Sequence, residues 1–249
     1  MRRRVSRLAV RVPATGAELR EFVLQVAGVH ETINIEAAPD YAVAAVSSGT
    51  RTLTLLLDIP QAISVVSREQ IQDQLMMSIA DVVRYVPGMT SHQGENNRDQ
   101  VTIRGNNSSA DFFVNGVRDD VQYYRDLYNL DRVEALKGPN AMIFGRGGGG
   151  GVINRVTKEA GFTPIREFSA QGGSYSNKRV TADLGQPLGE KVAVRMNGMY
   201  ENSGSFRDFV NLKRFGVSPT LTVALGCTPA DTLIVDLIPR AIPWSPRLQ

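Results

Sequence analysis

The chain has 249 residues, of which 42% are hydrophobic and 21% are charged, and its formal net charge is +3. This length and composition predict one large or two ordinary globular domains and argue against disorder along the whole chain. The single cysteine, Cys227, excludes an intrachain disulfide, and with only two histidines the sequence argues against a zinc site. The small positive charge does not indicate a nucleic-acid partner, and no apolar run reaches the roughly 20 residues of a membrane-spanning helix.

Residues 1–57 show no sustained hydrophobic period, and we predict a flexible arm with some strand tendency near Leu53–Leu57. The most apolar stretch near the start, Leu19–Val29, contains two charged residues and is too polar for the hydrophobic region of a signal peptide. We therefore expect no export signal in the sequence as given.

Two short helices are expected after the first strand of the next region. The run Ala62–Val66 is rich in β-branched residues and predicts a strand. Ser67 and Ser78 each stand where a hydroxyl can cap the first turn of a helix, and each is followed three residues later by a polar side chain that can complete a capping box. We therefore predict helices over residues 67–75 and 78–85.

Beyond residue 99 the hydrophobic period changes to two, which is typical of strands. We expect strands at residues 101–105, 112–114, 117–118, 132–137 and 152–157. Between the second and third of these, Asn115-Gly116 favours a type I′ turn, because both central residues of that turn need a positive φ. Residues 58–160 are therefore predicted to form a compact mixed α/β domain.

A cluster of glycines precedes the last of these strands. Gly145, Gly147 and Gly150 have the G-x-G-x-x-G spacing of nucleotide-binding loops, but that motif requires a helix after it. Here the β-branched run 152–157 follows. We interpret the cluster as a close crossing of two backbone segments that leaves no room for side chains.

No set of residues has the composition of a catalytic or metal site. His92 lies in a polar stretch with Glu95 and Asp99, but no nucleophile accompanies it. Asp119 and Asp120 lack the ligand spacing of a calcium loop. We therefore expect neither an enzyme nor a resident metal.

Residues 165–225 alternate apolar and polar residues over longer runs. In residues 179–184, Val180, Ala182 and Leu184 alternate with charged or polar neighbours, and the same pattern recurs in residues 192–197 and 215–225. Strands of about ten residues with one apolar face are typical of an outer-membrane β-barrel. A soluble antiparallel sheet with one wet face has the same pattern, so the residues alone leave both alternatives open. Prolines interrupt the pattern afterwards, and residues 226–249 are predicted to be an irregular tail.

A series of motifs resembles, in order and spacing, the plug domain of TonB-dependent outer-membrane receptors, and the ferric-siderophore branch most. The motifs are Asp58–Val66, Asp81–Gly88, Thr102–Gly105, Phe113–Arg118, Asp131–Pro139, Phe144–Gly147 and Gly150–Lys158. Residues 165–225 look like the first barrel strands of these receptors. The resemblance therefore implies an α+β plug domain, a mixed sheet with short helices, followed by the first few antiparallel strands of an incomplete transmembrane β-barrel.

The resemblance also implies site residues for a receptor that imports a ferric siderophore. Arg104 and Tyr128 match positions that contact the ligand in a hydroxamate-type member, and Asp120 and Gln122 fall in the loop that corresponds to another ligand-binding apex. The residues themselves leave alternatives open. Arg104 can instead form an ion pair with Glu134, and Tyr128 can serve packing alone.

The segment made of Glu31, Thr32, Ile33, Asn34 and Ile35 is similar to the TonB box of the family. An extended segment of this kind can add as a strand to the sheet edge of a partner. The resemblance implies three partners, which are TonB, a ferric siderophore and outer-membrane lipid, and it implies a bacterial outer-membrane location. No cofactor is expected, because iron arrives inside the siderophore chelate.

The length of the chain departs from this family. A complete receptor has about 22 strands, whereas residues 165–249 leave room for only three or four. An open sheet edge in lipid leaves backbone groups unpaired. We interpret the chain as a truncated form of the receptor. The alternative is a free-standing soluble plug-like binding module without transport activity, which would lose nothing if it were cut near residue 160.

Overall fold

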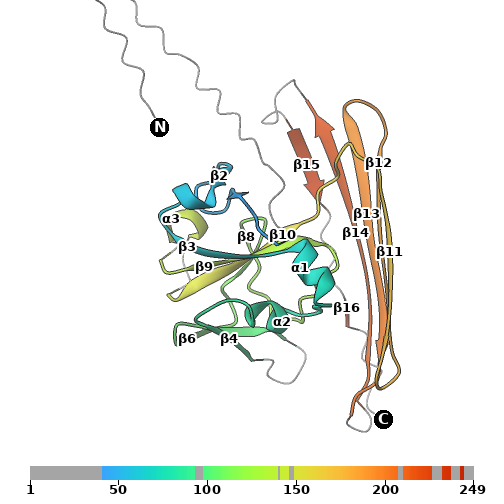
Figure 1. The fold of residues 1–249 in the computed structure, drawn as a ribbon, viewed down its shortest axis with the longest axis horizontal. Coiled ribbons are helices and arrows are strands. Elements are labelled where there is room, and N and C mark those ends of the chain that lie inside the picture. The colour runs from blue at the N-terminus through green and yellow to red at the C-terminus, as the bar shows by residue number, and fades with distance from the viewer. Residues whose placement is uncertain are drawn as a thin grey trace, which may run out of the picture. The chain divides into compact units, whose positions relative to one another are not determined.

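The computed structural model describes residues 41–92, 98–139, 141–145, 149–206, 210–225, 232–236 and 242–243. All of them belong to the larger of two compact units, Ala37–Gln249. They form an α+β domain, residues 41–160, and a sheet of long strands within residues 165–243, which we call the C-terminal sheet (Figure 1). The segment 31–35 that resembles a TonB box lies outside the described residues, so that interpretation stays a prediction.

The α+β domain contains short helices between strands of one central sheet. Its elements are β1 (Ala45–Val46), β2 (Thr54–Leu55), the 3-10 helix η1 (Leu56–Asp58), β3 (Ala62–Ser67), α1 (Arg68–Asp73), α2 (Ile79–Val83), β4 (Met89–His92), β5 (Gln100–Ile103), β6 (Asn106–Ser108), β7 (Phe112–Val114), β8 (Val117–Arg118), β9 (Leu130–Lys137), α3 (Ala141–Phe144) and β10 (Gly151–Thr157). The central sheet has the order β3-β9-β10-β7-β8, and only the β10–β7 pair is parallel among these strands. The strands β4, β5 and β6 form a second, antiparallel sheet.

Two serine caps set the starts of α1 and α2, as the sequence predicts. The hydroxyl of Ser67 accepts a hydrogen bond from the backbone N–H of Gln70 at 3.3 Å. Ser78 and Asp81 form a complete capping box, because the side chain of each accepts a bond from the backbone N–H of the other. A cap of this kind stabilises a helix by about 1 kcal/mol. Both helices end two residues earlier than predicted.

Backbone geometry confirms the two predictions that rest on glycine. Asn115 and Gly116 have φ values of 49° and 79°, as a type I′ turn requires. A Cβ atom on Gly150 or on Gly151 would lie only 2.3 Å from a carbonyl oxygen of a neighbouring strand. The end of the glycine cluster, Gly150 and Gly151, is therefore a close backbone crossing, and the strand β10 runs on from it where a nucleotide-binding loop would need a helix.

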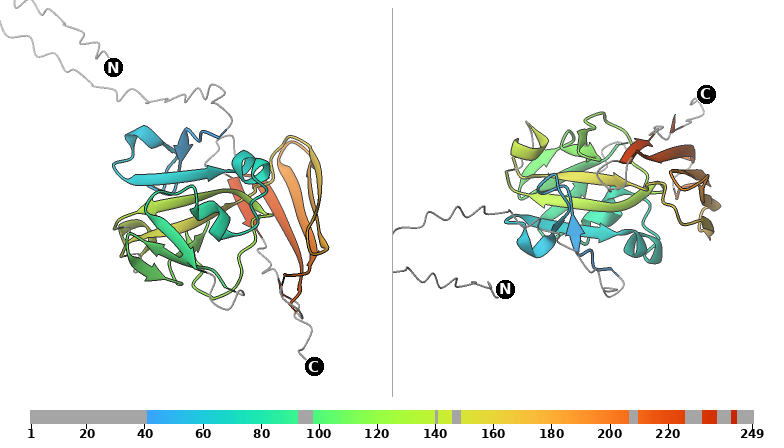
Figure 2. Two further views of the ribbon diagram at one scale, coloured as in Figure 1. Left: turned by 60° about the horizontal axis from the view of Figure 1, so that its bottom comes forward. Right: turned by 90° about the horizontal axis from the view of Figure 1, so that it is seen from above.

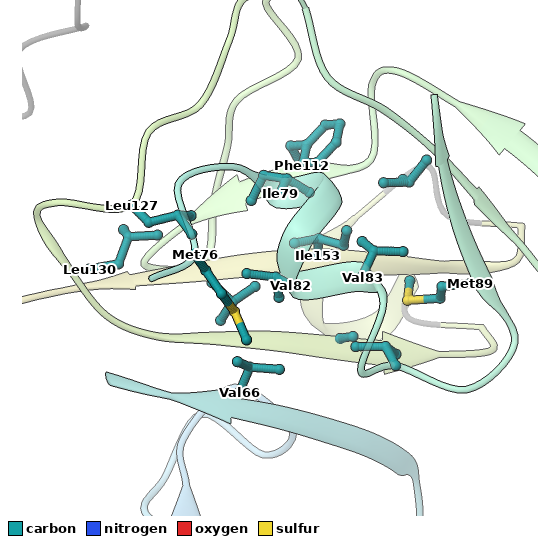
Figure 3. Close-up of a cluster of buried hydrophobic side chains, with 14 of the residues drawn as sticks. Val66, Met76, Ile79, Val82, Val83, Met89, Phe112, Leu127, Leu130 and Ile153 are labelled. Carbon is teal, nitrogen blue, oxygen red and sulfur yellow. The ribbon is translucent and has the colours of Figure 1, made fainter. Parts of the chain in front are cut away.

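The main core lies between α2 and the central sheet (Figure 3). Ile79, Val82 and Val83 of α2 are buried and cluster with Val66 of β3 and Ile153 of β10. Burying a side chain of this size contributes about 1.5–3 kcal/mol. The cluster fixes the sheet from which the loops of the candidate site extend.

The first residues of the α+β domain, 41–57, pack on the rest of that domain. We had predicted a flexible arm up to residue 57. The strands β1 and β2 pair antiparallel, Val46 is fully buried, and Ser48 is buried beside the central sheet. β2 lies within the stretch Leu53–Leu57 where we predicted strand tendency, whereas β1 has only two residues and no measurable period.

The C-terminal sheet consists of long antiparallel strands. They are β11 (Ile165–Gly173), β12 (Asn177–Pro187), β13 (Val192–Ser203), β14 (Leu212–Ala224), β15 (Thr232–Asp236) and β16 (Ile242–Pro243). The order is β11-β12-β13-β14-β15, and β16 pairs with the other end of β14. The prediction of an irregular tail over 226–249 is wrong for β15 and β16, because these short pieces pair with a strand that is already formed.

The two faces of the C-terminal sheet are inverted relative to a soluble sheet. Its polar side chains face the α+β domain and are buried, as with Arg179, Asp183 and Arg214, which are at most 4% exposed. Its apolar side chains point away, and Val180 and Val217 are 49% and 48% exposed. A soluble sheet would bury the apolar face on its core. The observed arrangement is the one predicted for a wall with a polar interior and an apolar exterior.

Among the residues that the structure describes, no helix is both long and apolar enough to cross a bilayer.

Candidate functional site

The first residues of the connection between β8 and β9 form an exposed loop that carries two of the predicted site residues, whereas Tyr128 lies further along the same connection. Asp120 and Gln122 are both exposed. The carboxylate of Asp120 accepts a bond from Nε of Arg118 at 3.2 Å, and Nε2 of Gln122 donates to the hydroxyl of Ser109 at 3.1 Å. Arg98 donates to the other end of the Gln122 amide. The loop therefore presents both donors and acceptors, and it is joined to the end of the β5–β6 hairpin.

The buried side chain of Arg125, three residues after Gln122, holds the backbone of this loop in place. Arg125 is fully buried, and its guanidinium lies between the rings of Phe112 and Tyr123, at 3.9 and 4.6 Å from their centroids. Its Nη2 atom donates to the backbone carbonyls of Asp119 and Val121 at 3.0 and 2.6 Å. A charged donor held between two aromatic faces has few alternative positions. The loop is consequently fixed before any ligand arrives.

Two titratable groups near Arg125 are perturbed by burial. Asp99 is 2% exposed and accepts a bond from the backbone N–H of Arg125 at 2.6 Å. Burial raises the pKa of Asp99 to about 6. Burial also raises the pKa of Tyr123, whose hydroxyl donates to Asp119 at 2.6 Å.

Arg104 lies apart from this loop. It occupies the two-residue turn of the β5–β6 hairpin, with a φ of 50°, and its backbone N–H donates to the carbonyl of Gly88 at 3.0 Å. The hairpin places it at the end opposite Ser109. The alternative ion pair with Glu134 is wrong, because Glu134 is fully buried and pairs with Nε of Arg132 at 2.7 Å.

Tyr128 is buried where the α+β domain meets the C-terminal sheet. The residue is 9% exposed, and a Cβ atom on Gly216 of β14 would lie 2.7 Å from its hydroxyl oxygen. Burial raises the pKa of Tyr128. Only a glycine at position 216 leaves room for this ring. Tyr128 is therefore a contact between the α+β domain and the C-terminal sheet. It is not grouped with Asp120 and Gln122.

Buried ion pairs join the α+β domain to the C-terminal sheet, and the first group centres on Asp126. Its carboxylate accepts bonds from Arg179 of β12 at 2.6 and 2.9 Å and lies 3.0 Å from Nη1 of Arg214 of β14. Glu201 of β13 pairs with the same two arginines. The Arg214 guanidinium also lies over the ring of Tyr124, 4.3 Å from its centroid. We call these four charged residues the Asp126 cluster.

The second group centres on Asp183 of β12. Its carboxylate accepts two bonds from Arg195 of β13 at 2.8 Å, and Nζ of Lys158 lies 2.9 Å away. Arg68, the first residue of α1, approaches the same carboxylate at 3.3 Å. Burial lowers the pKa of Lys158, which also donates to the carbonyl of Tyr128. Both views in Figure 2 draw α1 beside the C-terminal sheet.

A cavity of about 470 Å³ lies between α1 and the strands β11 and β12. Its lining includes Ile71 of α1 with Leu75 and Met76 just after that helix, and the polar residues Lys158, Arg179, Thr181 and Asp183. Within the described residues, no group of three or more metal-ligating side chains is present. The site residues that sequence analysis missed are Asp126 and its partners. Arg179 and Asp183 stand out as the polar members of an alternating run, but only the fold shows which charges they meet.

With this geometry in place, the comparison with known families is decisive. Residues 56–152 match the family described as "TonB-dependent Receptor Plug Domain". The chain contains a TonB-dependent receptor plug domain. The plug, as we now call the α+β domain, begins 15 residues before the match and ends 8 residues after it.

Relatives are similar over the plug and the following strands. The chain is 37% identical to the probable TonB-dependent receptor BfrD of Bordetella pertussis, in an alignment that covers 72% of this chain and 25% of BfrD. The solved open form of the ferric-catecholate import receptor Fiu from Escherichia coli K12 is 32% identical, with a TM-score of 0.64 over 69% of this chain and 26% of Fiu. The siderophore receptor PiuA from Acinetobacter baumannii is 28% identical, with a TM-score of 0.68 over 75% of this chain and 27% of PiuA.

The chain spans about a quarter of the length of the curated relatives it matches. The predicted fold class is confirmed, since the plug and the antiparallel strands after it match the corresponding parts of solved siderophore receptors. These relatives are receptors, and none of the three is named as an enzyme.

Proposed function

We propose that this chain contributes the plug and the adjoining wall strands of a TonB-dependent outer-membrane receptor that imports a ferric siderophore. One observation carries the proposal. The plug is followed directly by strands whose polar face meets it through buried ion pairs and whose apolar face points away. Such a sheet suits a wall between lipid and a filled interior. A free-standing soluble module would instead leave this apolar face in water, where it would favour aggregation.

The exposed loop with Asp120 and Gln122 is the part of the plug best suited to contact a ligand. Its side chains are exposed, they offer donors and acceptors, and Arg125 fixes their backbone. Binding on a loop held by a rigid scaffold requires little ordering. Arg104, exposed at a separate turn, adds a cation to the plug surface. Tyr128 would act in this scheme by holding the plug against β14.

The siderophore supplies the iron ligands in this scheme. The protein then needs only a surface that fits the chelate. Iron is cargo, and no resident cofactor is proposed.

TonB is the proposed source of energy. The segment 31–35 would pair with the sheet edge of TonB by main-chain hydrogen bonds. Traction on that segment would then move the plug relative to the wall. The proposed location is the bacterial outer membrane, because the match is to receptors of that type and the outward face of the C-terminal sheet is apolar.

Uptake measurements test the proposal directly. Cells that lack the gene for this chain are supplied with radiolabelled iron as a catecholate, a hydroxamate or a carboxylate chelate, and the gene is then restored. We expect uptake of one chelate class to fall on deletion, to return with the gene, and to disappear when TonB is inactivated. Unchanged uptake of all three classes after deletion would overturn the proposal.

Two variants locate the ligand contact. Gln122→Ala is expected to weaken uptake at low chelate concentration, because it removes a donor and an acceptor from the loop. Arg84→Ala is the control, since its side chain is 77% exposed and it lies away from the loop, directly after α2. Equal uptake by both variants would show that the loop is not part of the ligand site.

A further inference from the structure

Residues 45–51, which we call the clasp, fasten the N-terminal part of the described chain to the plug. They comprise β1 and the turn that follows it. Val46 is fully buried, and a Cβ atom on Gly49 would lie 2.9 Å from the side chain of Ile59 and 3.1 Å from that of Ile63. The turn therefore lies so close to the plug that only a glycine fits without rearrangement of these side chains.

Ser48 is hydrogen-bonded to the centre of the plug sheet. Its hydroxyl donates to Oε2 of Glu134 and accepts from Nδ2 of Asn154 at 2.9 Å. Glu134 is fully buried on β9, and Asn154 is its direct cross-strand partner on β10. The Oδ1 atom of the same Asn154 amide accepts from the backbone N–H of Gly116 at 2.9 Å, in the β7–β8 turn. One hydroxyl of the clasp thus takes part in a network that joins β9, β10 and the turn between β7 and β8.

Arg51 forms the second attachment. Its guanidinium donates to the backbone carbonyl of Ile143 and lies 5.8 Å from the centroid of the Phe144 ring, both in α3. It also approaches Gly116, where an added Cβ would lie 3.0 Å from Nη1. Figure 1 shows β2 and α3 near one another beside the central sheet.

The remaining attachment of this segment is small. The β1–β2 ladder has only two residue pairs, Ala45 with Leu55 and Val46 with Thr54, and it joins the segment to itself. Its direct polar attachment to the sheet and to α3 therefore depends on two side chains, those of Ser48 and Arg51.

We propose that the clasp is the point at which traction on the N-terminal arm reaches the plug, and that Ser48 and Arg51 are the positioning residues that transmit it. The described part of the chain first makes one exposed hydrogen bond, from the hydroxyl of Tyr41 to Asp73 of α1 at 2.9 Å, and then passes through the clasp before it reaches β3. A force on the arm therefore loads the buried contacts of the clasp before it loads the long ladder of β3 with β9. Withdrawal of Ser48 would leave the buried Glu134 carboxylate without one of its three donors. That loss would weaken the sheet at its centre. The role in traction rests on the proposed TonB-dependent function, whereas the attachment itself does not.

Thiol protection tests the attachment. The full chain, with its one cysteine removed by Cys227→Ser, is purified in detergent micelles and carries either Ser48→Cys or Ser47→Cys. Ser47 is exposed and Ser48 is buried, so the two neighbours are a matched pair. We expect a maleimide to label position 48 at least about tenfold more slowly than position 47, and Arg51→Ala to reduce this difference. Equal rates at both positions in the folded chain would overturn the clasp.

A second readout covers the case in which cysteine at position 48 itself loosens the clasp. Ser48→Ala is compared with Ser47→Ala by hydrogen exchange of the amides in β9 and β10. We expect faster exchange around Glu134 and Asn154 only in Ser48→Ala, by about tenfold. Identical exchange in the two variants would overturn the assigned role of the hydroxyl.

A third experiment separates this inference from the proposed function. In cells, labelling of Ser48→Cys is compared with and without active TonB. Faster labelling with active TonB supports traction through the clasp. Unchanged labelling in cells whose siderophore uptake requires TonB would overturn the clasp as the point of traction and leave the proposed function standing. Loss of the proposed function itself would be seen in the uptake assay, with resting protection at position 48 retained.

Discussion

Asp126 offers the strongest single test of how the plug is held against the C-terminal sheet. Its side chain is 1% exposed and is the only carboxylate that the plug contributes to the Asp126 cluster described above. Asp126→Ala removes the partner of two buried guanidinium groups, those of Arg179 and Arg214, and leaves both to share Glu201. Breaking a buried ion pair in this way costs about 3–5 kcal/mol, because an uncompensated charge stays buried.

The matched control is Asp120→Ala. The side chain of Asp120 is 54% exposed, and its partner Arg118 lies at 3.2 Å. Removing an exposed pair of this kind costs at most about 1 kcal/mol. Both variants of the full chain are unfolded with urea in detergent micelles and followed by circular dichroism. If Asp126→Ala changes the free energy of unfolding no more than Asp120→Ala does, the ion pairs do not hold the plug to the sheet.

Three further predictions concern the residues Gly216, Asp99 and Ile33. Gly216→Ala should destabilise the folded chain by about 1–3 kcal/mol, because the new Cβ would meet the ring of Tyr128. Adding Tyr128→Phe to the same chain should recover part of the lost stability. Additive effects of the two substitutions on the free energy of unfolding would contradict this contact. Burial raises the pKa of Asp99 to about 6, so its ionisation opposes folding, and the free energy of unfolding should fall as the pH rises from about 4 to about 6. Asp99→Asn should flatten that slope and stabilise the chain at pH 7 by up to about 3 kcal/mol, and an unchanged pH profile of unfolding would refute the assignment. Ile33→Pro should abolish TonB-dependent uptake while chelate binding persists, because proline removes a main-chain donor from the predicted added strand; normal uptake would exclude that segment as the TonB contact.

The elements that sequence analysis predicted well are those with a local chemical cause. The caps at Ser67 and Ser78 and the turn at Asn115-Gly116 depend only on residues within one turn of the chain, and the structure contains all three. The glycine cluster was also interpretable, because a following β-branched run excluded a helix. Such features need no knowledge of distant contacts.

Features that depend on distant partners were missed. β1 is two residues long and was not predicted, and the clasp is fixed by Glu134, 86 residues from Ser48. The alternation of apolar and polar residues predicted strands with two different faces. It did not predict which face is buried, because that depends on what packs against the sheet. For Tyr128 the sequence left ligand contact and packing both open, and the fold adds a packing contact with Gly216 that the sequence did not identify. No signal near Tyr128 in the sequence points to a glycine so far along the chain.

The central claim is that the C-terminal sheet turns its apolar face to lipid and its polar face to the plug. Val180 and Thr181 are neighbours on β12 that test it directly, since Val180 points outward at 49% exposure and Thr181 lines the cavity beside α1. Each is replaced by cysteine in the Cys227→Ser chain, labelled with bimane and placed in bilayers that contain brominated lipid. We predict strong quenching of the label at position 180 and weak quenching at position 181. Equal quenching at the two positions, or stronger quenching at 181, would contradict the account.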